Sequence, residues 1–192
     1  MARRKTVTRQ QILNAAYELI STEGFSNLTA RNIAAQIGCS TQPIYLEFEN
    51  MGELKDTLFE KIYTHLEEDM FLKEHTGDSI IDFSLNYMRF AKEEPRLYTA
   101  LFLEKGNEHR MLKFSYDLFF KNVKKDEKYA NLSEEKLENL LNGTWVIATG
   151  VASLASSGTI HPNDEQKIQL MKDAVTAFMK LDHKLELNPQ MN

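Results

Sequence analysis

Side chains able to do chemistry are scattered along this 192-residue sequence and do not form a catalytic pattern. His65 and Asp69 are one helical turn apart, as metal ligands can be, but no third ligand accompanies them at a suitable spacing. The sequence also lacks a phosphate-cradling glycine loop and a nucleophile elbow. We therefore expect no enzymatic activity, no cofactor and no metal, and we interpret the acidic run 67–69 as a solvated helix face.

The more informative residues lie between Thr29 and Asn50, where two short segments with helical apolar spacing flank the tripeptide Gly38-Cys39-Ser40. Thr29 is placed to cap a helix over 30–37, and Ser40 is placed to cap a second helix over 41–48. Gly38 can adopt the positive φ of a helix C-cap at low steric cost. This spacing is typical of a helix-turn-helix.

The second of these helices carries the residues that could recognise DNA. Thr41, Gln42 and Pro43 are expected in its first turn, from which side chains reach base edges in the major groove. Gln42 is the best candidate base reader because its amide can bond adenine through two hydrogen bonds. Thr29 and Ser40 would present hydroxyls and helix N-termini to phosphates.

This segment resembles the N-terminal domain of the tetracycline-repressor (TetR/AcrR) family of bacterial regulators. The matching positions, which span the helix-turn-helix and its flanks, are Gly24, Thr29, Ile33, Ala34, Gly38, Cys39, Ser40, Ile44, Tyr45, Phe48, Asn50 and Leu54. The resemblance implies that Thr29 and Tyr45 contact phosphates while Thr41 and Gln42 face bases. The complete set of residues expected at DNA is Thr29, Arg31, Ser40, Thr41, Gln42, Pro43, Tyr45 and Lys55.

Two positions depart from the family pattern. Glu47 stands where the family usually has His or Tyr, and Met51 stands where it often has Lys. Both changes remove favourable phosphate contacts, and Glu47 can repel the DNA backbone. Lys55, one turn along, is the candidate to supply the missing charge.

The charge distribution fits a local DNA footprint on an acidic protein. The net charge is −5, but residues 1–50 carry five cations against four carboxylates, so the rest of the chain holds the negative charge. Four of these cations form a basic N-terminal arm: Arg3, Arg4, Lys5 and Arg9. The single cysteine and the lack of any long apolar run are expected of a cytoplasmic protein that does not enter a membrane.

Helix start and stop signals recur throughout, and no segment alternates with the period of a strand. We therefore predict an all-α fold of about nine helices, with a three-helix DNA-binding domain over residues 1–50 and a helical ligand-binding and dimerisation domain over 51–192. A long helix from Asn50 to about Glu74 would join the two domains. Further helices are expected over 79–93, 95–105, 108–125, 133–156 and 163–181.

The C-terminal part is expected to form a homodimer and an effector pocket, as family members do. Aromatic residues at helical spacing are the candidate ligand-binding residues: Phe83, Tyr87, Phe102, Tyr116 and Trp145. The last two long helices would build the dimer interface, because they carry small residues that allow close approach, together with Phe178. The small residues are Gly143, Ala148, Gly150, Ala152 and Ala155.

The resulting hypothesis is a transcriptional repressor that binds palindromic double-stranded operator DNA as a dimer and is released by a small, mostly apolar effector. Two alternatives stay open. One is a DNA-binding organiser of the same fold that has no small effector and acts through protein partners, and the other is an all-α enzyme that contains a helix-turn-helix. A fully packed interior would favour the first, and polar groups converging in a cavity would favour the second.

Overall fold

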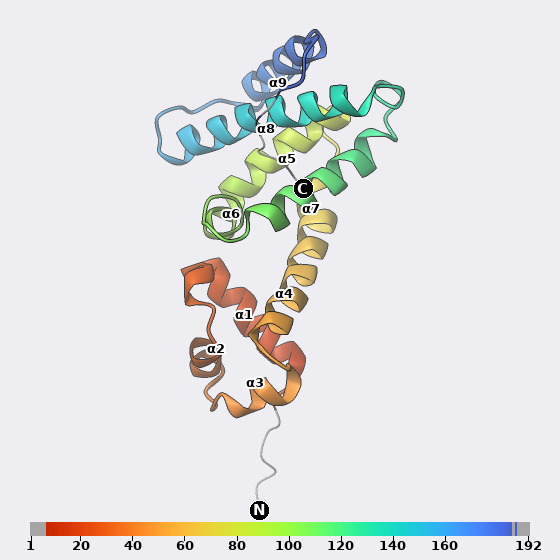
Figure 1. Cartoon of the computed structure of the whole chain (residues 1–192). Helices are drawn as coiled ribbons and strands as arrows, with labels where there is room; N and C mark the ends of the chain where they lie inside the picture. Colours follow the sequence, from red (N-terminus) through yellow and green to blue (C-terminus); the bar gives the residue numbers. More distant parts are fainter. Residues whose placement is uncertain (1–6, 186, 188–192) are drawn as a thin grey trace, which may run out of the picture. The chain divides into compact units, whose positions relative to one another are not determined.

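The computed structural model describes residues 7–185 and 187, and every regular element within them is helical (Figure 1). This described part contains nine α-helices, one 3-10 turn η1 (Phe25–Asn27) and one π-helical segment η2 (Leu66–Phe71). The all-α prediction is confirmed. The α-helices are α1 (Arg9–Glu23), α2 (Ala30–Ile37), α3 (Gln42–Glu47), α4 (Met51–His65), α5 (Ser79–Glu93), α6 (Pro95–Phe102), α7 (Glu108–Val123), α8 (Glu134–Ser156) and α9 (Asp164–Met179).

Local capping interactions determine where several of these helices begin. Thr8 and Gln11 form a reciprocal capping box at the start of α1, and Asn163 and Gln166 form another at the start of α9. The Ser133 hydroxyl accepts a hydrogen bond from the first turn of α8. Each cap is made by a residue type favoured at helix N-termini, so these helix starts follow from the local sequence.

The helix that begins after Asn50 ends differently from the prediction. Its α-helical part stops at His65 and is followed by η2, whereas the sequence pattern predicted a helix reaching Glu74. Side chains of α5 take up the carbonyls that this ending leaves open: Arg89 donates to the Asp69 and Met70 carbonyls, and Asn86 donates to those of Phe71 and Lys73. The ending therefore depends on a distant segment of the chain.

The chain divides into two compact units. Unit 1 comprises Met1–Leu66 and Glu94–Glu108, so it contains α6 in addition to the helices α1 to α4. Unit 2 comprises Glu67–Glu93 and His109–Asn192. The predicted functional boundary lies at residue 50, whereas the whole of α4 belongs to unit 1. The functional division itself stays a prediction.

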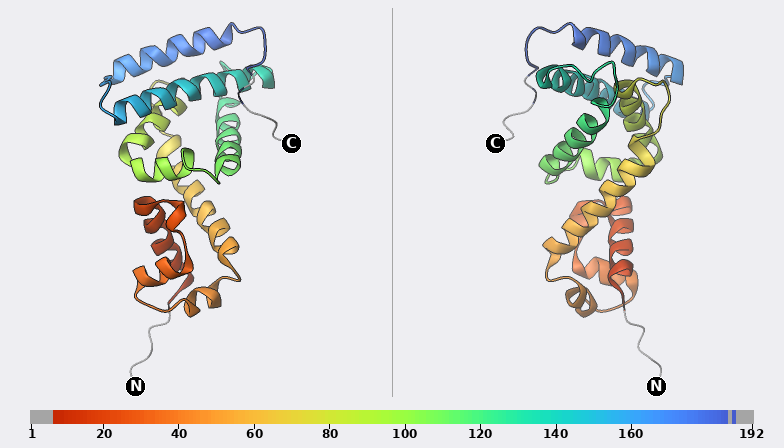
Figure 2. Two further views of the ribbon diagram at one scale, coloured as in Figure 1. Left: turned by 60° about the vertical axis from the view of Figure 1, so that its left-hand side comes forward. Right: turned by 90° about the vertical axis from the view of Figure 1, so that its right-hand side faces the viewer.

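Each unit has an apolar core of its own. In unit 1, α1 packs against α2, α4 and α6, and its residues Ile12, Ala16 and Ile20 are completely buried. In unit 2, α5 packs against α8 and α9, and α8 and α9 lie side by side (Figure 2). Among the described residues, no helix has the length and apolar character needed to span a bilayer.

Candidate nucleic-acid interface and ligand cavity

The helix-turn-helix is formed by α2, a tight turn and α3. The Thr29 hydroxyl caps α2 by accepting from Asn32 N at 3.2 Å. Gly38 takes the left-handed conformation, with φ of +75°, and Cys39 N donates to Ala34 O at 2.9 Å to close the turn. The predicted role of Gly38 is confirmed, and the turn leads the chain directly into α3.

The start of α3 corrects one detail of the prediction. Thr41, and not Ser40, occupies the N-cap position, and its side chain makes no capping hydrogen bond. Pro43 lies in the first turn, where its missing N–H costs nothing because first-turn amides have no partner within the helix. The hydroxyls of Ser40 and Thr41 belong to exposed residues and do not cap this helix.

The two sides of α3 differ sharply in burial. Ile44 and Phe48 are buried in the core of unit 1, as their spacing predicted. The opposite side exposes three of the eight expected DNA-contacting residues together with one that sequence reasoning missed, Leu46, which is 77% exposed. The outward residues are Thr41, Gln42, Tyr45, Leu46 and Glu49.

The missed residue could have been found from the sequence. Helical spacing that turns Ile44 and Phe48 inward places the residue midway between them, Leu46, on the outward side. Its apolar type hid it, because polar residues were sought as base readers.

Two exposed cations lie on the helices before and after α3. Arg31 lies in the first turn of α2, and Lys55 lies in the second turn of α4. Neither forms an ion pair with another residue of the described part. The helix α3 itself carries no cation and ends in Glu47, so phosphate attraction at this surface depends on its neighbours.

Arg9 was assigned to the basic arm but is used inside unit 1. Its guanidinium lies 4.0 Å from the centroid of the Phe48 ring and donates to the Glu47 carbonyl. It also donates to Glu53 Oε1 at 2.8 Å and to Thr57 Oγ1 at 3.2 Å. Arg9 therefore ties the start of α1 to α3 and α4. The other arm residues, Arg3, Arg4 and Lys5, lie outside the described residues.

The same contact changes the acidity of Glu53. The hydrogen bond from Arg9, reinforced by one from Glu49 N, lowers the pKa of the Glu53 carboxyl below its ordinary value of 4.5. Glu53 thus stays ionised around neutral pH, and its second oxygen accepts from Glu49 N at 2.6 Å. The Glu53 carboxylate on α4 thereby holds the short segment that connects α3 to α4.

Four of the five predicted ligand-binding residues lie in unit 2. The Tyr87 hydroxyl accepts from Thr149 Oγ1 at 3.2 Å, and the Tyr116 hydroxyl donates to Asn142 Oδ1 at 3.3 Å. The Trp145 Nε1 is buried and has no hydrogen-bond partner in the described structure. The fourth, Phe83, packs on the rings of Phe71, Phe119 and others in the core.

The fifth predicted residue, Phe102, belongs to unit 1. It ends α6 and stacks on Tyr98, with 5.8 Å between the ring centroids. The prediction treated all five residues as one group, but the structure assigns Phe102 to a different compact unit from the other four.

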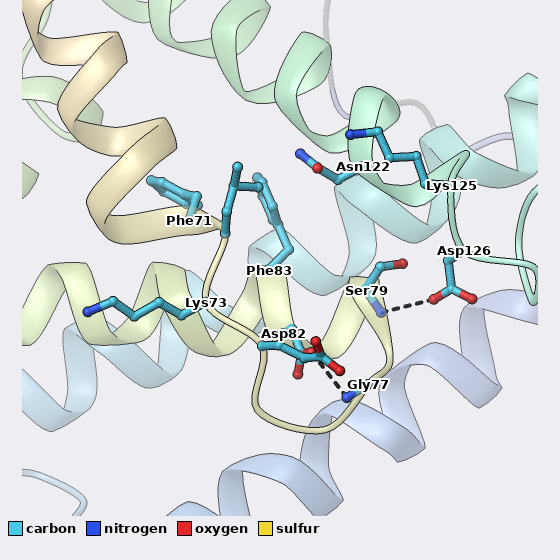
Figure 3. A pocket seen from close by; sticks show the side chains of 11 residues that line it. Phe71, Lys73, Gly77, Ser79, Asp82, Phe83, Asn122, Lys125 and Asp126 are labelled. Carbon is cyan, nitrogen blue, oxygen red and sulfur yellow. Dashed lines mark hydrogen bonds between the residues drawn. The ribbon is translucent and has the colours of Figure 1, made fainter.

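Unit 2 contains a cavity of about 350 Å³ between the end of η2, the first turns of α5 and the end of α7 (Figure 3). Phe71 and Phe83 form its apolar wall, and their ring centroids are 5.0 Å apart. Of the predicted ligand-binding residues, Phe83 lines this cavity. Its volume lies at the small end of the range for small-molecule sites.

Two carboxylates at the cavity have structural partners. Asp82 accepts from Thr76 N at 2.8 Å and from Gly77 N at 3.2 Å, and Asp126 accepts from Ser79 N at 3.0 Å. These bonds hold the loop before α5 in place (Figure 3). In the described residues, no three His, Cys, Asp or Glu side chains gather as a metal site requires. His65 instead pairs with Glu94 at 2.7 Å in unit 1.

Solved structures with the same fold are bacterial regulators. A TetR-family transcriptional regulator from Vibrio parahaemolyticus is similar with a TM-score of 0.59 at 17% identity, covering 89% of this chain and 96% of that one. A TetR-family regulator from Marinobacter aquaeolei gives a TM-score of 0.57 at 16% identity, covering 92% and 98%. FadR from Bacillus subtilis, solved in complex with stearoyl-CoA, gives 0.55 at 15% identity, covering 90% and 98%. At such identities the likeness establishes the fold.

No curated protein sequence is significantly similar to this chain. The family relationship comes instead from the helix-turn-helix region. Residues 12–58, which run from α1 into α4, match the model of the tetR family of bacterial regulatory proteins. This match covers the segment whose turn, caps and outward α3 face are described above, and it assigns residues 12–58 to the tetR family of bacterial regulatory proteins.

Proposed function

We propose that this regulator is a repressor that binds a palindromic operator as a homodimer and is released by a small, mostly apolar effector. The observation that carries the DNA-binding part is the outward face of α3. It exposes Thr41, Gln42 and Tyr45 in the helix that follows the turn, while Ile44 and Phe48 hold that helix to unit 1. A face that is rigidly supported and lined with hydrogen-bonding side chains suits the major groove.

The outward side of α8 supports dimerisation. Val146 and Leu154 are exposed apolar residues two turns apart, and Gly150 between them has nothing within 4 Å of where a Cβ would lie. On the neighbouring α9, Leu170 is also exposed. A second copy that packed its own α8 and α9 on this surface would bury these apolar side chains across a two-fold axis.

The cavity in unit 2 supports an effector. Its Phe71 and Phe83 wall favours an apolar body, and a few polar groups at its edge could orient a ligand. The related FadR of Bacillus subtilis was solved with stearoyl-CoA, a ligand with a long apolar chain. We therefore favour the effector-controlled repressor over an organiser without a small ligand.

Selection from a pool of random duplexes by the full-length protein tests the DNA-binding part. The enriched sequences should form an inverted repeat with half-site centres about 10 base pairs apart or a multiple of this. Gln42→Ala, the matched control, should relax the preference at one base pair per half-site. Enrichment of single half-sites would contradict a dimeric reader, and the absence of any enrichment would contradict the function itself.

Repression is tested in cells with a reporter placed behind the selected operator. Expression of the protein should lower reporter output, and expression of Gln42→Ala should lower it less. Higher output in the presence of the wild-type protein would identify an activator and would overturn the repressor assignment. This assay depends on the operator alone and needs no knowledge of the effector.

A further inference from the structure

Leu46 is the most exposed of the large apolar side chains in the described structure, with 77% of its surface accessible. A single exposed leucine on a protein surface needs no explanation by itself. This one, however, lies on α3, the helix whose outward side is the candidate DNA surface. An apolar side chain is therefore exposed on the surface that is the candidate for DNA contact.

The neighbours of Leu46 on α3 define what it can face. Gln42 lies one helical turn before it on the same side, and Tyr45 is adjacent and 52% exposed. Ile44 and Phe48 are turned into the core and fix the helix from behind. If Gln42 reaches a base edge in the major groove, Leu46 lies in the same groove, about 6 Å further along the helix axis.

The chemistry of the groove then selects a partner for an apolar side chain. Leu46 cannot donate or accept a hydrogen bond, so it gains nothing from the N7, O6, O4 or amino groups of the bases. The one apolar group on the major-groove edges is the C5-methyl of thymine. Opposite cytosine or a purine, the same side chain would bury polar edge atoms without bonding them, which is unfavourable.

We infer that Leu46 specifies a thymine in each operator half-site by packing on its 5-methyl group. An advance of about 6 Å corresponds to roughly two base-pair steps of 3.4 Å, so this thymine lies within about two base pairs of the base that Gln42 reads. The inference rests on the proposed DNA-binding function and adds a specificity residue to it.

The test removes the methyl group without changing anything else. Starting from the selected operator, each thymine is replaced in turn by uracil in both half-sites, and binding of the full-length protein is measured by fluorescence anisotropy. At one position the wild-type protein should lose about fourfold in affinity per half-site, which is the worth of one buried carbon group of ~0.8 kcal/mol. The Leu46→Ala variant should bind the thymine and uracil operators at that position with equal affinity.

Two control variants sharpen the result. Gln42→Ala should keep the uracil penalty at that position, and Leu46→Met, which preserves apolar bulk, should keep most of it. Since Leu46 is exposed, Leu46→Ala should melt at the wild-type temperature, which verifies folding. Selection with Leu46→Ala should also lose the preference for thymine over cytosine at the same position.

Two outcomes would overturn the inference while leaving DNA binding intact. Either the wild-type protein binds every uracil operator as tightly as the thymine operator, or Leu46→Ala retains the full uracil penalty. If no duplex is enriched by the wild-type protein at all, the DNA-binding function fails, and the role of Leu46 fails with it. The two kinds of failure are therefore distinct.

Discussion

The ring of Phe178 on α9 covers Gly143 on α8 so closely that a Cβ at position 143 would lie 2.4 Å from two of its ring carbons. Both residues were assigned to the dimer interface on the basis of sequence. In the structure they contact each other within one chain, whereas Gly150, two turns along α8, faces open space. Substitutions at position 143 therefore test packing within the subunit, and substitutions at position 150 test the proposed association of two subunits.

Gly143→Ala should leave the protein less stable than Gly150→Ala by about 1–3 kcal/mol, because the new methyl group displaces the Phe178 ring. The two variants are matched, since each replaces a helical glycine by alanine and gains the same helix propensity of about 1 kcal/mol. Urea unfolding followed by circular dichroism measures both. Adding Phe178→Ala to each variant should abolish the difference in stability. Equal stabilities of the two single variants would contradict the packing argument.

Gly150→Leu should weaken the dimer while leaving the fold intact. The added side chain meets no atom of its own subunit, so any steric cost must come from a second copy. Sedimentation velocity at micromolar concentration should show dimers for the wild-type protein and monomers for the variant, with operator binding reduced in parallel. A wild-type protein that is folded but monomeric would rule out this interface.

Arg9→Ala should lower the melting temperature by several degrees, because it removes bonds to the Glu47 carbonyl, Glu53 and Thr57 as well as the contact with Phe48. Arg31→Ala is the matched control, because this exposed cation makes no ion pair in the described part of the chain. It should weaken DNA binding without changing the melting temperature. If Arg9→Ala instead weakened DNA binding without lowering the melting temperature, Arg9 would belong to the DNA-contacting arm.

The Arg9–Glu53 contact also predicts a pH dependence. Since the pKa of Glu53 is lowered in the folded protein, its contribution to stability is present above the ordinary value of 4.5 and is lost as the pH falls through the lowered pKa. The difference in melting temperature between wild type and Arg9→Ala should therefore be largest near neutral pH and shrink below about pH 4.5. A constant difference down to pH 3 would contradict this linkage.

Glu47→Gln should strengthen DNA binding, because it removes a negative charge from the end of α3. The effect should be a few-fold at low salt, smaller at high salt, and similar for operator and unrelated duplexes. Folding should be unaffected, since Arg9 bonds the backbone carbonyl of Glu47 and not its side chain. Unchanged affinity at low salt would mean that this carboxylate lies away from the DNA backbone.

Trp145 is a second candidate contact for the effector, although it does not line the cavity walled by Phe71 and Phe83. If the effector binds beside it, Trp145→Phe should abolish the response to effector without affecting operator binding in the absence of effector. The substitution keeps a ring but removes the buried Nε1 donor that has no partner in the described structure. Compounds that raise the melting temperature of the wild-type protein serve as the probes. Compounds that also release the operator from the wild-type protein should neither raise the melting temperature of Trp145→Phe nor release the operator from it. An unchanged response would place the effector away from Trp145.

Sequence reasoning succeeded at most positions whose determinants were local. The caps at Thr8, Thr29 and Asn163 depend on residues three positions apart, and the left-handed Gly38 depends on its own missing side chain. Ser40 was wrong as a cap because the turn that Gly38 and Cys39 close moves the start of α3 by one residue.

The remaining features depend on contacts between distant segments. The end of η2 is held by Asn86 and Arg89, which lie on α5. Arg9 could not be separated from the basic arm without knowing that Phe48 and Glu53 lie beside it. Phe102 could not be separated from the other aromatic residues without the packing of α6 on α1. Periodicity predicts which side of a helix is buried but not which element covers it.

The compact unit that contains the helix-turn-helix is discontinuous along the gene, because it includes α6. Any recombination between two such regulators that exchanged only the codons up to residue 66 would pair the α1 of one parent with the α6 of the other. The mismatch would fall within unit 1, where α1 packs on α6 and where the backbone amide of Phe25 bonds the half-buried Glu104 carboxylate at 3.1 Å. Functional hybrids should therefore require residues 94–108 to travel with the N-terminal segment, so that both parts of this compact unit are inherited together.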